Sequence, residues 1–96
     1  MYILITYDVD TTHKEGARRL RNVAKACTNY GQRVQNSVFE CDITEAQLSM
    51  LKEIINRSID DKTDSVRIYS LAKNYAKRVE VIGKETAYNV SQAMIV

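Results

Sequence analysis

The residues best suited to chemistry in this chain are two aspartates that follow an apolar stretch near the N-terminus. The stretch 2–7 reads YILITY, and it is followed by Asp8 and, two residues later, by Asp10. A carboxylate at the end of a buried strand is held rigidly, and carboxylate oxygens are ligands that Mg²⁺ prefers. The competing interpretation is that both aspartates shape the turn after the strand, a common role for this residue. The residues alone leave both interpretations open.

Other common kinds of site are not indicated. The chain has one histidine, His13, and only three glycines, so neither a Ser/His/Asp or Cys/His catalytic set nor a glycine-rich phosphate loop is present. Cys27 and Cys41 are too far apart for a zinc-binding pair, and their apolar neighbours predict buried, reduced thiols. No apolar run is long enough to cross a membrane, and the N-terminus lacks the pattern of a signal peptide. We therefore expect a cytoplasmic protein without membrane association.

The charged residues are segregated along the chain, although the net charge is only +2. Residues 11–35 contain one acidic residue, Glu15, among several basic ones, whereas residues 40–64 carry seven acidic and three basic side chains. Such segregation favours a face that binds a polyanion, and the alternative is two solvated helices of opposite charge. The basic residues of the first segment are Lys14, Arg18, Arg19, Arg21, Lys25 and Arg33.

The elements that position these residues follow from periodicity. The stretch 2–7 predicts a central strand, apolar on both faces. Residues 12–15 (THKE) fit a capping box that opens a helix closed at Gly31. Residues 33–43 are expected to be extended, with a turn at 36–37 and with Phe39 on the apolar face. A second capping box, 44–47 (TEAQ), opens another helix, and the segments 65–71 and 78–83 predict two further strands.

This order predicts an α+β fold of the ferredoxin-like type. The pattern is βαββαβ with an extra C-terminal strand, an antiparallel sheet and both helices on one face. We expect residues 1–83 to form this domain and the apolar-ended tail 84–96 to dock on a second protomer. A homodimer is expected because one face of the sheet would otherwise be bare.

Several stretches together resemble the CRISPR-associated protein 2 family, the small subunit of the spacer-acquisition machinery. The similarity runs from residue 2 to about residue 83, and its most specific part is the string GQRVQNSVFECDIT. The other stretches that carry it are ILITYDVD, the basic helix, RIYSL and RVEVIG.

The resemblance implies a homodimeric, metal-dependent nuclease, acting on single-stranded RNA in some members and on duplex DNA in others. It also implies a partner, the larger CRISPR integrase subunit, with which family members hold duplex DNA. The family's catalytic, metal-binding aspartate matches Asp8, with Mg²⁺ or Mn²⁺ as cofactor. Asp10 aligns near a second acidic position. The other positions that the family's motifs use match Tyr7, Arg18, Arg19, Arg33 and Phe39.

From the resemblance and the charge pattern we expect Asp8 to bind the metal and Tyr7, Asp10 and Phe39 to support it. A two-fold axis near the end of the first strand would bring two copies of Asp8 around one cation. The residues expected to bind nucleic acid are Lys14, Arg18, Arg19 and Arg33. Two alternatives stay open: a non-catalytic, DNA-binding bridge in the acquisition complex, and a ferredoxin-like interaction module with a protein partner.

Overall fold

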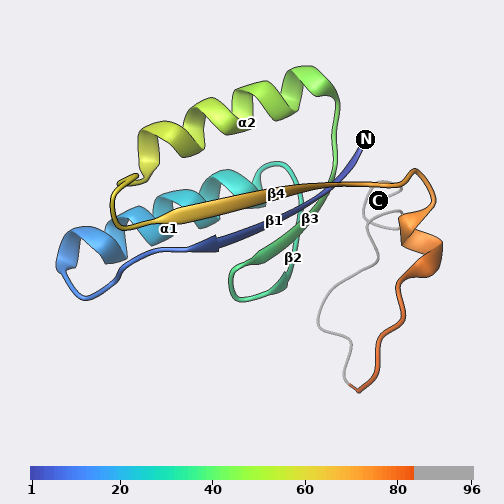
Figure 1. Cartoon of the computed structure of the whole chain (residues 1–96), viewed down its shortest axis with the longest axis horizontal. Coiled ribbons are helices and arrows are strands. Elements are labelled where there is room, and N and C mark those ends of the chain that lie inside the picture. The colour runs from blue at the N-terminus through green and yellow to red at the C-terminus, as the bar shows by residue number, and fades with distance from the viewer. Residues whose placement is uncertain (84–96) are drawn as a thin grey trace.

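The structure is a computed structural model, and it describes residues 1–83. Its elements follow one another as strand, helix, two strands, helix and strand, with a short 3₁₀ helix at the end (Figure 1). This order confirms the ferredoxin-like fold class. The elements are β1 (Tyr2–Asp8), α1 (Lys14–Thr28), β2 (Gln32–Gln35), β3 (Val38–Asp42), α2 (Glu45–Ser58), β4 (Ser65–Leu71) and η1 (Tyr75–Arg78).

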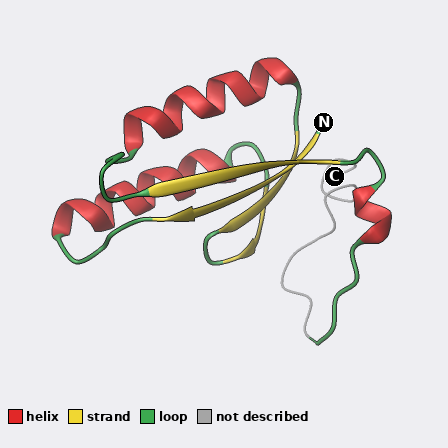
Figure 2. Ribbon diagram, viewed as in Figure 1, coloured by secondary structure: helices red, strands yellow, loops and turns green. Residues whose placement is uncertain are grey.

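The four strands form one antiparallel sheet in the order β2-β3-β1-β4, with β1 in its interior. Both helices lie on one side of it (Figure 2). Side chains alternate along β1, so that Ile3, Ile5 and Tyr7 are buried on the helix side. Thr6 and Asp8 lie on the opposite side, which we call the open face because no described helix covers it.

The core lies between the sheet and the two helices, as the sequence periodicity predicted. Phe39 is its largest fully buried side chain, and Leu51 of α2 packs in the same cluster. Cys27 and Cys41 are buried free thiols, which confirms the expectation for them. Burial raises the pKa of Cys27 to about 11 and that of Cys41 to about 12, so both are protonated at neutral pH.

The first expected capping box does not form. The N-cap of α1 is His13, without a side-chain cap hydrogen bond. Thr12 instead donates its amide and its hydroxyl to Oδ1 of Asp10, at 3.0 and 2.7 Å. The prediction was wrong because the N-cap lies one residue later than expected, at His13, and because the Thr12 amide, which a capping box would direct to Glu15, donates to Asp10 instead.

Two other local predictions are confirmed. Thr44 is the N-cap of α2, and its hydroxyl accepts from the Gln47 amide at 3.1 Å, while the Gln47 side chain accepts from the Thr44 amide at 2.9 Å. The extended run divides at the expected place, because β2 ends at Gln35 and β3 begins at Val38. The strand pair therefore forms a hairpin that carries Phe39 into the core.

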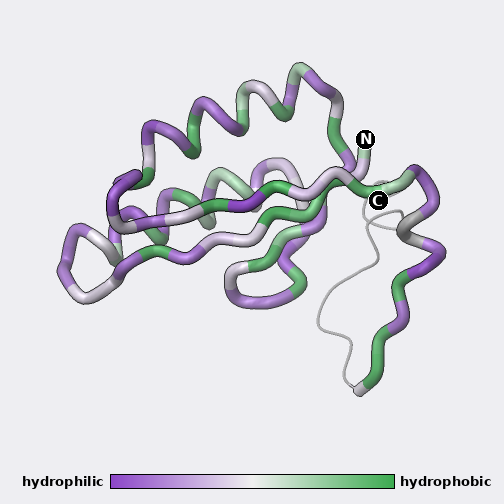
Figure 3. Tube along the Cα trace, viewed as in Figure 1, coloured by the Kyte–Doolittle hydropathy of each residue, from purple (hydrophilic) through white to green (hydrophobic). Residues whose placement is uncertain are grey.

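The strand expected at residues 78–83 is not formed within the described chain. η1 ends at Arg78, and residues 79–83 pair with no strand of the sheet. A strand needs a neighbour to satisfy its amides and carbonyls, and this segment leads away from the sheet (Figure 1). Its apolar side chains Val79, Val81 and Ile82 are 43, 52 and 97% exposed. Figure 3 shows hydrophobic and hydrophilic residues in turn along this segment. The expected docking of the tail 84–96 lies outside the described residues.

Substitution of Thr44 and of Thr12 tests whether each residue caps the helix that follows it. We expect Thr44→Ala to lower the free energy of unfolding by about 1 kcal/mol, because it removes an N-cap. Thr12→Ala is the matched control and should cost clearly less, since Thr12 caps no helix. Urea unfolding followed by circular dichroism measures both, and equal decreases would contradict the assignment.

Candidate functional site

Asp8 lies where β1 ends, on the open face of the sheet. In the antiparallel ladder it is paired with Ser65, the first residue of β4. Its side chain is exposed, and no hydrogen bond or ion pair of its carboxylate occurs among residues 1–83. The backbone that carries it is held by the ladder with β4, which reaches Asp8, and by the ladder with β3, which ends at Thr6. Asp8 therefore presents free carboxylate oxygens to solvent from a rigid position.

Asp10 has a different environment, although it is only two residues away. Its Oδ1 accepts both hydrogen bonds from Thr12 described above. The Thr12 amide and then the Thr12 hydroxyl lower the pKa of this exposed carboxyl. The Asp10 carboxylate thus holds the loop between β1 and α1, as the turn-forming interpretation predicted for it.

Asp64 is a buried carboxylate at the same end of the sheet. Its side chain is 0% exposed, and its Oδ2 accepts from Arg19 Nε at 2.8 Å and from the Asp60 amide at 2.9 Å. Its Oδ1 accepts from the Asp10 amide and from the Thr63 hydroxyl, both at 3.1 Å. Burial by itself would raise the pKa of this carboxyl, but the donors, Arg19 foremost, outweigh burial and lower the pKa to about 2.

Arg19 lies on the side of α1 that faces the sheet, and it completes this arrangement. Besides the bond to Asp64, its terminal NH2 group is 3.5 Å from the Asp10 carbonyl oxygen. The same carbonyl lies against Gly16, where any Cβ would collide with it. The loop after Asp8 is therefore held between Gly16 and Arg19 on α1 and Asp64 before β4. Arg19, expected to bind nucleic acid, already has a carboxylate partner.

Three other residues that match family motifs lie together on the helix side of the sheet. The rings of Tyr7 and Phe39 are stacked with centroids 6.1 Å apart, and the guanidinium carbon of Arg33 is 5.2 Å from the Phe39 centroid. The Tyr7 hydroxyl donates to the Asn36 carbonyl at 3.4 Å. Burial raises the pKa of Tyr7, an effect that Arg33 partly offsets.

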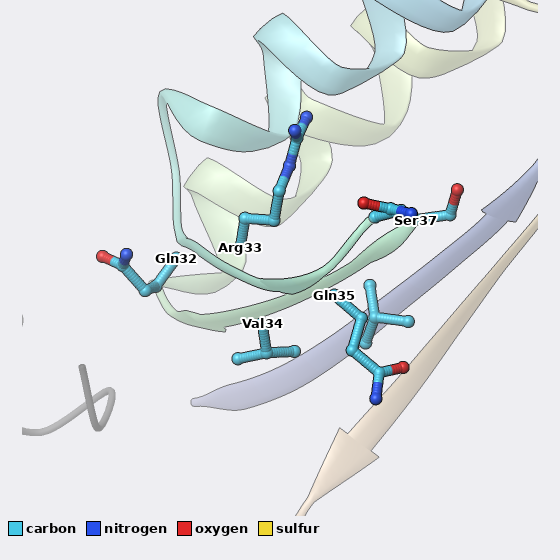
Figure 4. Close-up of a pocket in the computed structure, with 7 residues that line it drawn as sticks. Gln32, Arg33, Val34, Gln35 and Ser37 are labelled. Atoms are coloured by element: carbon cyan, nitrogen blue, oxygen red, sulfur yellow. The ribbon is translucent and has the colours of Figure 1, made fainter. Parts of the chain in front are cut away.

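This aromatic group does not face Asp8. Successive side chains of β1 point to opposite sides of the sheet, so the Tyr7 ring and the Asp8 carboxylate diverge. Figure 4 shows Arg33 on the helix side of the β2–β3 hairpin, while Val34 and Gln35 point away from that side. Tyr7 and Phe39 therefore pack β1 and β3 together without contact with the Asp8 carboxylate, and Arg33 is an exposed cation above the Phe39 ring.

The exposed cations of α1 form one stripe, which we call the basic stripe. At about 100° per residue they fall within an arc of about 60°, opposite the buried positions of the helix. All are exposed and have no ion-pair partner among residues 1–83. The stripe joins the expected Lys14 and Arg18 to two residues that the site prediction omitted, and its members are Lys14, Arg18, Arg21 and Lys25.

The helical spacing in the sequence distinguishes Arg19, which pairs with Asp64, from the exposed arginines of the basic stripe. Arg19 follows Gly16 by three residues and precedes Val23 by four, so it falls on the buried side of α1. Nothing in the sequence indicated that Asp64 is buried, because an acidic residue in a polar loop is usually solvated and its partner Arg19 is distant in the sequence. On the open face, Arg67 is paired with Thr6 and so lies diagonal to Asp8, as strand alternation from Ser65 implies.

Of the three carboxylates described above, that of Asp8 is the one available to a hard divalent cation. The Asp10 carboxylate is occupied by Thr12 and that of Asp64 by Arg19 and backbone amides, whereas that of Asp8 is free. Among residues 1–83, however, no three metal-ligating side chains gather at one point. One protomer therefore offers a single carboxylate ligand, which suits a cation that retains most of its water.

Comparison with known proteins identifies the family. The model of the family described as CRISPR associated protein Cas2 matches residues 1–79. The CRISPR-associated endonuclease Cas2 of Halalkalibacterium halodurans is 52% identical over 95 residues, which cover 99% of both chains. The CRISPR-associated endoribonuclease Cas2 1 of Moorella thermoacetica is 52% identical over 83 residues, 86% of each chain. The chain belongs to the Cas2 family of CRISPR-associated proteins, and the resemblance of its sequence motifs is confirmed.

Solved structures agree with this membership. A crystal structure of Streptococcus pyogenes Cas2 at pH 6.5 is 54% identical, with a TM-score of 0.79, and the match covers 86% of this chain and 100% of that one. The hypothetical protein TT1823 of Thermus thermophilus is 34% identical, with a TM-score of 0.69 over 88% of this chain and 92% of that one. Among the described helices, none has the length and apolarity needed to cross a membrane.

The buried carboxylate gives the protein a specific sensitivity to acid. Because the pKa of Asp64 is lowered to about 2, it stabilises the fold above the ordinary aspartate pKa of 3.8, and this contribution disappears as pH falls through 2. We expect Asp64→Asn to cost about 3 kcal/mol at pH 7, since it leaves Arg19 without its charged partner.

Urea unfolding at pH 7, 4, 3 and 2 measures this effect. The gap between wild type and Asp64→Asn should narrow between pH 4 and pH 2, as the wild-type carboxyl becomes protonated. The control is Asp61→Asn, an exposed acid of the same loop, which should follow wild type at every pH. A gap of constant size would contradict the assignment of Asp64 as the titrating group.

Proposed function

We propose that this protein is a metal-dependent nuclease of the CRISPR spacer-acquisition step, which hydrolyses phosphodiester bonds at Asp8 and binds duplex DNA. The observation that carries the proposal is the free Asp8 carboxylate at the rigid end of β1, beside two carboxylates that are already engaged. The names of the relatives support the reaction class, because one is an endonuclease and the other an endoribonuclease.

The chain's own residues would bind and orient the reacting groups. Asp8 would hold Mg²⁺ or Mn²⁺, and a bound cation supplies charge stabilisation of the phosphate and a water of lowered pKa as nucleophile. Arg67, diagonal to Asp8 on the open face, would hold a phosphate oxygen of the substrate. No histidine lies on the open face among the described residues, since His13 is the N-cap residue of α1, so the proton of the attacking water would pass to solvent rather than to a histidine of this chain.

A homodimer would complete the site. The open face carries exposed Tyr69, 42% accessible, and the segment 79–83 presents apolar side chains without a partner strand among the described residues. A second copy that covers this face would bury those side chains and would bring a second Asp8 near the first. Two carboxylates around one cation is a common arrangement for Mg²⁺.

The basic stripe would bind the phosphate backbone of duplex DNA. From Lys14 to Lys25 the helix rises about 16 Å, a length over which one strand of a duplex carries roughly five phosphates. The exposed Arg33 would extend this surface, and the larger integrase subunit is the expected protein partner for DNA held in this way. Binding of this kind does not depend on sequence, as the capture of arbitrary DNA requires.

One observation favours the alternative, a non-catalytic bridge that only binds DNA. The basic stripe lies on the helix side and Asp8 on the open face, so the sheet separates the two in one protomer (Figure 2). DNA bound on the stripe would not bring its phosphates to Asp8 of the same chain. Substitution of Asp8 and substitution of the basic stripe should therefore abolish catalysis and DNA binding independently.

Replacement of Asp8 tests catalysis. We expect Asp8→Asn to lower Mg²⁺-dependent cleavage of duplex DNA or single-stranded RNA by at least about 100-fold, because it removes the ligand charge that binds the cation. Cleavage is measured with Mg²⁺, with Mn²⁺ and with EDTA, on both substrates, which also decides between DNA and RNA.

Asp61→Asn, an exposed acid outside the site, is the control and should cleave like wild type. Light scattering should give twice the chain mass of 11.0 kDa for both variants, so that dissociation of the dimer is not mistaken for removal of a metal ligand. Full activity of Asp8→Asn would refute the proposed catalytic role, and uncleaved but bound DNA in wild type would favour the bridge.

Neutralisation of the basic stripe tests DNA binding. We expect the double variant Arg18→Gln/Arg21→Gln to weaken duplex binding and to reduce the slope of log K against log salt by about 0.9 for each phosphate that the variant no longer neutralises. Lys52→Gln/Arg57→Gln on α2 removes the same charge from another exposed helix surface and is the matched control. Fluorescence anisotropy between 50 and 200 mM salt gives both slopes. Equal slopes in the two double variants would show that only net charge matters.

A further inference from the structure

We infer that Arg19 and Asp64 are a positioning pair for the Asp8 carboxylate, and that Arg19 acts on the strand end through Asp64 rather than by contact with nucleic acid. The inference rests on the proposed metal site at Asp8. It assigns to Arg19 a different task from that of Arg18, its immediate neighbour in the sequence.

Arg19 is surrounded by polar partners on the sheet side of α1. Its side chain is 22% exposed, and its Nε is 2.8 Å from an oxygen of Asp64, whose side chain is 0% exposed. Its terminal nitrogen lies 3.5 Å from the Thr63 hydroxyl and from the Asp10 carbonyl oxygen. A phosphate would have to displace these partners and leave a buried carboxylate without its cation, which is costly. Arg18, by contrast, is exposed and belongs to the basic stripe.

Arg19 and Asp64 are linked to Asp8 through the backbone on either side of it. Asp64 accepts from the Asp10 amide, and Arg19 approaches the Asp10 carbonyl, so both peptide groups of Asp10 are held. Asp64 also directly precedes Ser65, the residue paired with Asp8 across the strands. The pair therefore fixes the chain on both sides of Asp8, the loop that follows it and the strand beside it.

The loop that follows Asp8 also packs closely against α1. A Cβ at Gly16 would collide with the Asp10 carbonyl oxygen, so the loop has no room to shift toward the helix. Asp64 further accepts from the Asp60 amide, which ties in the turn before β4. A lone carboxylate that binds a hydrated cation depends on such support, because residues behind metal ligands commonly change metal affinity 10-fold or more.

The experiment compares Arg19→Lys and Asp64→Asn with wild type. Lysine keeps the charge, but a single ammonium group cannot replace the planar fork of arginine. We expect about 10-fold weaker Mn²⁺ binding in both variants, measured by electron paramagnetic resonance, and at least 10-fold faster hydrogen exchange of the Asp10 amide, measured by NMR. Arg57→Lys, an exposed arginine on α2, is the matched control and should leave both readouts unchanged.

DNA binding separates positioning from phosphate contact. Arg19→Gln should leave the salt slope of duplex binding unchanged, whereas Arg18→Gln should reduce it by about 0.9. The neutral pair Arg19→Gln/Asp64→Asn avoids an uncompensated buried charge and provides a folded form if a single variant unfolds. Its decrease in Mn²⁺ affinity should be smaller than the two single decreases combined, because the two residues act as one unit.

The outcomes for the metal site and for the positioning pair are distinguishable. If Asp8→Asn binds Mn²⁺ as tightly as wild type, the metal site itself is refuted. If Mn²⁺ binding is abolished in Asp8→Asn but intact in Arg19→Lys and Asp64→Asn, only the positioning pair is refuted. A reduced salt slope in Arg19→Gln would likewise overturn it, since Arg19 would then contact DNA.

Discussion

The buried carboxylate of Asp64 is the constraint on which this end of the molecule depends. Removal of a charge from water is costly, and the cost is offset only when every oxygen finds donors. Here Arg19, the Asp10 and Asp60 amides and the Thr63 hydroxyl supply them. These donors come from α1, from the loop after β1 and from the turn before β4, so a single carboxylate fixes three segments at once.

This constraint also decides which charges remain available for function. Arg19 and Asp64 neutralise one another, and the carboxylate of Asp10 is held by Thr12. What remains at the strand end is the carboxylate of Asp8, and on α1 it is the basic stripe. Although the net charge of the chain is small, two separate charged sites remain, namely the carboxylate of Asp8 on the open face and the basic stripe on the helix side.

The sequence predicted the elements where local pattern and tertiary packing agree. The strand pattern around Asp8, the Thr44 cap and the turn before Val38 all follow from short-range preferences that the fold satisfies.

Prediction failed where one group had two possible partners, because Thr12 could cap α1 or bond to Asp10, and it bonds to Asp10. It also failed at residues 79–83, which have β-type side chains but no strand beside them in the described sheet. The role of Asp64 could not be predicted, since only the fold reveals which acid meets Arg19.

A dimer formed through the open faces would separate Asp8 from the basic stripes. Both Asp8 carboxylates would lie inside such a dimer, and the two basic stripes would lie on its opposite outer surfaces. A duplex lying on one stripe would then be separated from the carboxylates by a full sheet, about 10 Å or more of packed protein. A substrate phosphate could reach Asp8 only from the end of the sheet, past the loop held by Arg19 and Asp64. The same loop would therefore both position the metal ligand and border the entrance to it.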